Sequence, residues 1–267
     1  MANKSLRSFA IQVRQIILRQ SKHAHVGHIG SSLCIADIIS VLYGQVLRIK
    51  STNDPDRDRF VLSKGHSALA LYAALYLRGW LSPELLETYC QENTLLGVHP
   101  ERGLPGVDFG TGSLGIGMSY ATGAALAAQL QKSRRRVFVL VSDAECNEGI
   151  IWEAAMFAAH HHLSNLFAIV DLNGQQALGY TRDVLDLTPL PQKWQAFGWD
   201  VHEIDGHDTD QIIQTIKTCE KNTGQPHVII ARTTFGKGVS FMENQIKWHY
   251  WPMSEAEYDE ALREISR

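Results

Sequence analysis

The sequence predicts an α/β fold in which helices flank a mostly parallel central sheet. Two observations predict it: short apolar runs alternate with helical patterns in the C-terminal half, and each connection between runs is long enough for a helix. Strands joined in this way run parallel, with right-handed crossovers. The expected strands are Val137–Ser142, Leu166–Asp171, Asp200–Ile204 and His227–Arg232. The helical stretches between them are Ile150–His161, Pro189–Phe197 and Thr209–Glu220.

The N-terminal half is expected to be mainly helical. Apolar residues recur at three- and four-residue intervals over Ser5–Lys22, which is the period of an amphipathic helix. Further helical patterns cover about Ile35–Leu47 and, after the short apolar segment Phe60–Ser63, about Ser67–Arg78. Pro83 fits the first turn of another short helix. The 267 residues, 45% of them hydrophobic, suffice for a large core, and no linker is visible, so we expect a single domain over residues 1–267.

A long loop is expected between Thr94 and Gly117, where seven glycines and two prolines leave no room for regular structure. Loops of this length usually carry function. Gly110, Gly112 and Gly115 match the spacing of a dinucleotide-binding loop, but no strand precedes them and no ribose-binding carboxylate follows at the required distance. A phosphate-binding loop around Gly236-Lys237 also fails, because the required first glycine and the required Ser or Thr are missing.

Composition excludes several classes of protein. The 25 basic and 28 acidic residues give a net charge of −3, which is too close to neutral for a nucleic-acid binder. No apolar run reaches the roughly 18 residues of a membrane span, and the N-terminus does not resemble a secretion signal. The four cysteines form no C-x-x-C pair, so their spacing suggests neither a zinc site nor a disulfide framework. We expect a cytoplasmic protein with no nucleic-acid or membrane partner.

Two polar residues that follow neighbouring strand patterns suggest a metal site. Asp143 comes directly after one expected strand and Asn173 comes thirty residues later, after the next. Ligands of parallel sheets bind at the carboxyl ends of the strands. A carboxylate, an amide oxygen and a nearby backbone carbonyl suit Mg²⁺ that also binds phosphate oxygens. Taken singly, each residue could simply begin a turn or cap a helix.

The segment SDAECNEGIIWEAAMFAAHHHLSNLFAIVDLNG (142–174) resembles the thiamine-diphosphate fingerprint of transketolases. The resemblance continues in GHIGSSL, RDRFVLSKGHSALALYAAL, GVHPE, DFGTGSLGIG, FGKGVSFMEN and KWH, in the family's order. It implies the thiamine-diphosphate-binding fold, with thiamine diphosphate and Mg²⁺ as cofactors. The implied metal ligands are Asp143, Asn173 and the backbone carbonyl of Gln175.

The resemblance also implies roles for side chains around the cofactor. The implied cofactor contacts are His66, Gly112, Ser113, Leu114, Asp143, Ala144, Glu148, Asn173, Gln175 and His249. The implied catalytic residues are His28, His66, His99 and His249, since imidazole titrates near neutrality and can move protons around a sugar hydroxyl or carbonyl. Glu148 and Glu153 match acidic positions of the family, the former at a subunit contact. A solvated helix face explains Glu153 equally well.

Four positions depart from the family's pattern. Ser142 and Ala144 replace the two glycines beside Asp143, although the backbone N–H of Ala144, which should touch a diphosphate oxygen, survives the change. Tyr250 stands where glycine is usual, and Leu178 where an acidic residue is common. The substrate is therefore not assumed to be a standard sugar phosphate.

The chain ends where the diphosphate domain of a transketolase ends, so the resemblance implies the N-terminal subunit of a split enzyme. The pyrimidine-binding and C-terminal domains would lie on a partner subunit that supplies the catalytic glutamate. We expect an α2β2 heterotetramer that transfers a two-carbon ketol unit from a ketose to an aldehyde acceptor. The alternative is a non-catalytic structural or regulatory partner that has lost cofactor binding.

Overall fold

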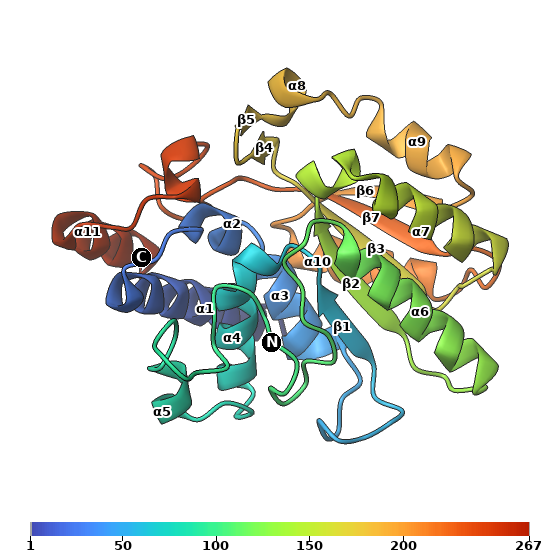
Figure 1. Cartoon of the computed structure of the whole chain (residues 1–267), viewed down its shortest axis with the longest axis horizontal. Helices are drawn as coiled ribbons and strands as arrows, with labels where there is room; N and C mark the ends of the chain where they lie inside the picture. Colours follow the sequence, from blue (N-terminus) through green and yellow to red (C-terminus); the bar gives the residue numbers. More distant parts are fainter. Residues whose placement is uncertain (1, 267) are drawn as a thin grey trace.

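The computed structural model describes residues 2–266 and confirms a parallel α/β architecture (Figure 1). The central strands are β1 (Arg59–Leu62), β2 (Val137–Ser142), β3 (Leu166–Leu172), β6 (Asp200–Asp205) and β7 (His227–Arg232). They lie in the order β1-β2-β3-β7-β6, and every neighbouring pair is parallel. A small antiparallel hairpin, β4 (Gln175–Gln176) with β5 (Gly179–Tyr180), stands beside the sheet.

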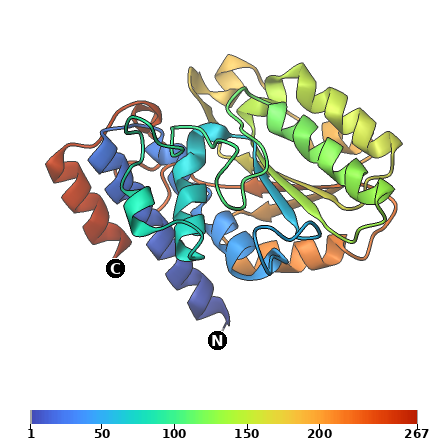
Figure 2. The same cartoon turned by 60° about the horizontal axis from the view of Figure 1, so that its bottom comes forward.

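Helices cover both faces of the sheet and also pack on one another beside it. They are α1 (Ala2–Ala24), α2 (Ile29–Leu33), α3 (Ala36–Val41), α4 (Ala68–Leu77), α5 (Pro83–Leu86), α6 (Ile116–Leu130), α7 (Gly149–His160), α8 (Thr181–Val184), α9 (Leu190–Ala196), α10 (Thr209–Cys219) and α11 (Glu255–Ile265). Figure 2 shows α1, α4 and α11 gathered at one end of the molecule, near both chain termini. In residues 2–266 no helix has the length and apolar content needed to cross a membrane.

Strands β2, β3 and β7 are largely apolar because both of their faces are buried, whereas the edge strand β6 is mostly half-buried or exposed. Successive side chains point to opposite faces, so Phe138 and Phe167 pack with α1, α3, α4 and α10, whereas Val139 and Ala168 pack with α6, α7 and α9. This explains why β2, β3 and β7 were predicted almost to the residue. Because all the central strands are parallel, their carboxyl ends lie at the same edge of the sheet.

Three helical regions differ from the expectation. The helix expected over residues 35–47 is divided into α3 and a π-helical turn at Leu42–Val46, and the separate short helix α2 precedes it. Helix α6 begins inside the expected loop; it follows Gly115, at φ 81°, and contains Gly117, where a Cβ would lie 2.6 Å from the Cα of Ser63. Helix α11, which was not predicted, begins with a capping box formed by Ser254 and Glu257.

Candidate functional site

The predicted metal-binding side chains lie at the carboxyl edge of the sheet, at the ends of neighbouring strands. Ser142 on β2 pairs with Asp171 on β3, and the N–H of Asp143 donates to the carbonyl oxygen of Asp171 at 3.1 Å. Asn173 follows two residues after Asp171. The expected neighbourhood of the two strands is therefore confirmed, and Asp143 and Asn173 both line one cavity of about 810 Å³.

Asp143 is a buried carboxylate without a cationic partner. Its Oδ2 accepts from the backbone N–H of Gly174 at 2.8 Å and from the hydroxyl of Thr181 at 3.1 Å, and its Oδ1 accepts from the N–H of Ala144 at 2.9 Å. No Lys, Arg or His of the described chain forms a salt bridge with it. Burial, together with the nearby negative charge of Asp171, raises the pKa of Asp143 to about 7.

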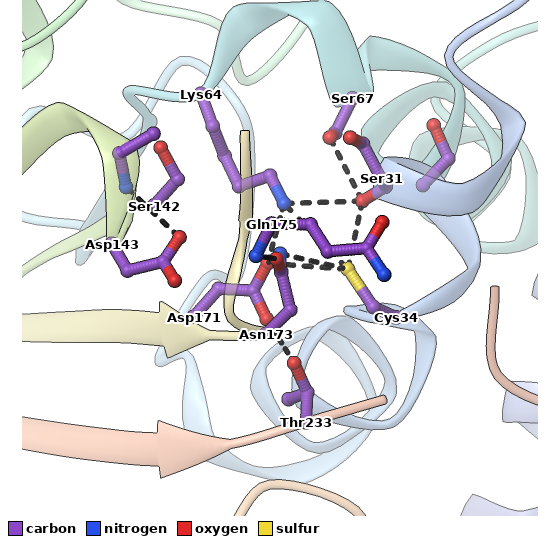
Figure 3. A network of polar contacts seen from close by, with 12 residues as sticks. Ser31, Cys34, Lys64, Ser67, Ser142, Asp143, Asp171, Asn173, Gln175 and Thr233 are labelled. Atoms are coloured by element: carbon purple, nitrogen blue, oxygen red, sulfur yellow. Dashed lines mark hydrogen bonds and ion pairs between the residues drawn. The ribbon is translucent and has the colours of Figure 1, made fainter. Parts of the chain in front are cut away.

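Asp171, in contrast, forms a buried ion pair with Lys64 (Figure 3). The ammonium nitrogen of Lys64 lies 2.5 Å from Oδ2 of Asp171, and both side chains are completely buried. Thr233 donates to the other carboxylate oxygen. Burial alone would raise the pKa of Asp171, but the Lys64 ammonium and these hydrogen bonds hold it below its usual value. The ammonium also donates to the carbonyl oxygen of Ser31 at 3.2 Å.

This ion pair orients the amide of Asn173. The Nδ2 group of Asn173 donates to Oδ2 of Asp171 at 2.8 Å, which leaves Oδ1 on the side of Gln175, where it accepts the Gln175 N–H at 2.9 Å. The side-chain amide of Gln175 is buried, and neither of its polar atoms has a hydrogen-bond partner among the described residues. The turn over residues 173–175 therefore presents oxygen atoms that could bind a metal. It also holds a buried side-chain amide, that of Gln175, whose polar atoms lack hydrogen-bond partners in the described chain.

A second buried carboxylate, Glu145, ties the turn after β2 to the rest of the site. It accepts from the N–H of Ser142 at 2.8 Å, the N–H of Gly115 at 2.7 Å and the hydroxyl of Ser63 at 2.6 Å. Ser142 also accepts the Glu145 N–H through its hydroxyl at 3.2 Å. The serine that replaces the usual glycine is thus accommodated by a local hydrogen bond without displacing Asp143 from the strand end.

Three of the four predicted histidines form one cluster. The ring centroids of His28, His66 and His249 lie 5.1–5.6 Å apart, and His99 lines the same cavity of about 400 Å³. The Nδ1 atoms of His28 and His249 are buried and have no hydrogen-bond partner within residues 2–266. Burial lowers the pKa of all three clustered imidazoles, that of His249 to about 4, so they are neutral near pH 7.

The predicted cofactor loop reaches the same cavity. Gly112 has φ 149°, and a Cβ there would lie 2.8 Å from the His99 ring, so only glycine allows this approach. Leu114 lines the cavity, while Ser113 between them is exposed. Glu148, which precedes α7, and Ala144 also line the cavity.

Two of the departures from the family's pattern lie at the rim of this cavity. Tyr250 is 54% exposed and its ring lies 4.8 Å from that of His249, while Leu178 is 83% exposed. Glu153 lies on the exposed side of α7 and is not among the residues that line the cavity. The rim thus carries bulky apolar side chains where small or acidic residues were expected.

Lys64, Asp171 and Glu145 were not identified from the sequence as parts of the site. Lys64 directly follows an apolar strand and its serine, Asp171 lies inside another strand, and both positions are too buried for an unpaired charge. The one sequence feature that could have pointed to the pair is a charged residue, Asp171, inside an otherwise apolar strand pattern. The partner of each could not be read from the sequence, because 107 residues separate Lys64 from Asp171.

Comparisons with known proteins agree with this geometry. The family model described as transketolase, thiamine diphosphate binding domain, matches residues 6–265. The chain is 41% identical to 6-deoxy-6-sulfo-D-fructose transketolase subunit SqwG of Clostridium sp. (strain MSTE9), over 96% of this chain and 94% of that protein. It is 40% identical to an apulose-4-phosphate transketolase subunit of Phocaeicola vulgatus, over 91% of this chain and 87% of that protein.

Solved structures extend the comparison. The crystal structure of transketolase from Campylobacter jejuni superimposes with a TM-score of 0.93 at 31% identity, over 98% of this chain but only 43% of that one. Fold and site therefore define a thiamine-diphosphate-binding domain of the transketolase type. The chain belongs to the transketolase family, as its motifs predicted, and it corresponds to the N-terminal subunit of a split transketolase.

Proposed function

We propose that this chain, as a single domain, holds thiamine diphosphate through Mg²⁺ bound by Asp143, Asn173 and the backbone carbonyl of Gln175. The observation that carries the proposal is the contrast at the strand ends, where Asp171 has a cation and Asp143 has none. Asn173 is oriented with its oxygen free of the Asp171 network. Hard oxygen donors of this kind are the ligands that Mg²⁺ prefers.

The remaining cofactor contacts follow from the second cavity. The Ala144 N–H donates to its neighbour's carboxylate oxygen Oδ1, a short local contact that a diphosphate oxygen can replace. We assign His66 and His249 to the diphosphate, and Gly112, Ser113, Leu114 and Glu148 to the surroundings of the cofactor rings. The orphaned Nδ1 atom of His249 supports this assignment, because buried polar atoms normally have partners.

The proposed reaction is transfer of a two-carbon ketol unit from a ketose to an aldehyde. The cofactor supplies a nucleophilic carbon and an electron sink. This chain contributes imidazoles: we assign His28 and His99 to the sugar, where each can accept a hydroxyl proton or donate a hydrogen bond to a carbonyl oxygen. Tyr250 and Leu178 border the path by which the sugar reaches these histidines.

A partner subunit is part of the proposal. Relatives of similar length are named as transketolase subunits, and the chain spans less than half of the transketolase from Campylobacter jejuni. We expect the partner to bring the pyrimidine-binding domain and the catalytic glutamate, in an α2β2 heterotetramer. Exposed apolar side chains on α6 and α7 support a subunit contact there: Tyr120, Leu130, Met156 and Phe157. The four unpaired cysteines fit the proposed cytoplasmic location.

A non-catalytic partner role is the second candidate, and one observation favours it. Ser142 and Ala144 replace both glycines of the metal-binding turn, and the Ala144 N–H already donates to Asp143. A chain that had lost cofactor would stabilise or regulate its partner without binding thiamine diphosphate.

Calorimetric titration of the reconstituted subunit pair with thiamine diphosphate and Mg²⁺ distinguishes the two candidates. The catalytic proposal predicts saturable, Mg²⁺-dependent binding and ketol transfer from a ketose donor, both lost in Asp143→Ala. An Asp143→Ala pair that binds cofactor and turns over normally would refute the metal assignment. A wild-type pair that binds no cofactor would favour the non-catalytic role.

A further inference from the structure

A second cluster of potential metal ligands lies at the amino-terminal ends of the strands, whereas the cofactor cavities lie at their carboxyl ends. Asp200 and His202 stand on the first residues of β6, and Cys219 ends α10, which packs on that strand. One carboxylate oxygen, one ring nitrogen and the sulfur of these three residues all lie within 4.8 Å of one another. The cofactor cavities lie at the other ends of the strands, so this cluster is separate from them.

One polar atom of this cluster has no hydrogen-bond partner among the described residues. The Nε2 atom of His202 lies 3.1 Å from Oδ2 of Asp200, yet it is a buried atom without a properly directed hydrogen bond among the described residues. This nitrogen therefore lies beside the Asp200 carboxylate without forming a well-directed hydrogen bond to it. A cation between the three groups would satisfy all of them.

We propose that Asp200, His202 and Cys219 form a binding site for a Zn²⁺-like divalent metal. A nitrogen, oxygen and sulfur ligand set is typical of Zn²⁺, whereas Mg²⁺ and Ca²⁺ avoid thiolates. Three protein ligands leave the fourth tetrahedral position to water. Asp200 and His202 are about one quarter exposed, so the metal can enter from their side, while Cys219 forms the buried base of the site.

His227 supports the site from the neighbouring strand. It pairs in register with Asp200, and its Nδ1 lies 2.9 Å from the same carboxylate oxygen, so it fixes the orientation of that ligand. Burial raises the pKa of the Cys219 thiol to about 12 in the metal-free chain, and metal binding would displace that proton. The site joins the beginning of the edge strand β6 to the end of α10 and thus stabilises the fold without taking part in catalysis.

Cobalt substitution tests the proposal. The full chain is stripped with a chelator, saturated with Mg²⁺ and thiamine diphosphate, and titrated with Co²⁺, whose bond to a thiolate gives a charge-transfer absorption band. We expect the band to appear at one equivalent, to disappear when Zn²⁺ is added, and to be absent in Cys219→Ser. The matched control Cys90→Ser, a half-buried thiol elsewhere in the fold, should retain it.

His202→Asn keeps the proposal testable if Cys219→Ser does not fold. This variant should bind Co²⁺ at least about tenfold more weakly, with an unchanged circular dichroism spectrum. A wild-type chain without a thiolate band would overturn the proposal, as would a band that persists in folded Cys219→Ser. A band equally strong in folded His202→Asn would do the same. Adventitious binding at the consecutive histidines 160–162 would give no thiolate band.

Discussion

Asp143 and Asp171 are the same residue type at the ends of neighbouring strands, and both are buried, but their electrostatic surroundings are opposite. Asp171 has the Lys64 ammonium at 2.5 Å and a lowered pKa. Asp143 accepts hydrogen bonds but forms no ion pair with any described residue, and its pKa is raised to about 7. In the part of the chain that the structure describes, the fold therefore neutralises one carboxylate with an internal ion pair and gives the other none.

This difference suggests a structural role for Asp171 and a binding role for Asp143. The Lys64–Asp171 pair fixes the fold and the orientation of Asn173, whereas Asp143 is held in place at a cost in free energy that a bound Mg²⁺ would offset. The two carboxylates should respond differently to mutation.

The largest effect is expected from Lys64→Met, which leaves Asp171 buried and unpaired. The free energy of unfolding, measured by urea denaturation, should fall by about 3–5 kcal/mol. Lys247→Met is the matched control, because Lys247 is half exposed and pairs with Glu257, so its loss should cost less than about 1 kcal/mol. Equal effects for the two lysines would contradict a structural role for the buried pair.

Asp143→Asn should weaken cofactor binding without reducing the stability of the fold. Without divalent cations, the variant should be at least as stable as the wild type, because it removes a buried carboxylate that has no cation. Its affinity for thiamine diphosphate in the presence of Mg²⁺ should fall by about 100-fold or more, since even the loss of a residue behind a metal ligand costs 10–100-fold. A strongly destabilised variant that still binds cofactor would reverse the assignments of the two carboxylates.

The pH dependence of Mg²⁺ binding sharpens the contrast further. Protons compete with Mg²⁺ for Asp143, whose pKa of about 7 means that the binding form is lost as the pH falls below 7. The affinity should be about tenfold lower at pH 6 than at pH 8, measured by titration calorimetry with Mg²⁺ alone. Asp171 cannot produce this change, because its pKa lies below its usual value. An affinity that is constant between these pH values would show that Asp143 is not the competing group.

The smallest effect is expected from restoring the usual glycines. In Ser142→Gly/Ala144→Gly, the backbone N–H groups at both positions remain, so affinity for the cofactor should change by less than about threefold, or about 0.6 kcal/mol. Fluorescence titration of the reconstituted pair measures this directly. A large gain in affinity would instead support the non-catalytic role of the natural chain.

Much of the sheet and part of the site could be predicted because both depend on local pattern. Strands buried on two faces appear as continuous apolar runs, and the polar residues that follow them must lie at one sheet edge. Asp143 and Asn173 were found in this way. The histidines came from motif resemblance, and the structure places His28, His66 and His249 in one cluster with His99 beside the same cavity.

The features that were not predicted depend on distant partners. Helix α6 was not predicted because Gly117 is a helix breaker by its local pattern, although the fold needs a glycine there for close contact with Ser63. The Lys64–Asp171 pair was not predicted because it joins residues far apart in the chain. The cluster of Asp200, His202 and Cys219 escaped notice because its ligands come from a strand and a helix, without the spacing of a zinc motif. Pairing across the fold is information that no local pattern contains.

The most direct measurement is an anomalous-scattering map of the chain crystallised with its partner, thiamine diphosphate and Mn²⁺ in place of Mg²⁺. We predict one peak at the strand ends, bonded to a carboxylate oxygen of Asp143, Oδ1 of Asn173 and the carbonyl oxygen of Gln175, at distances of about 2.0–2.2 Å. A cofactor bound with its metal away from Asp143 would contradict the account.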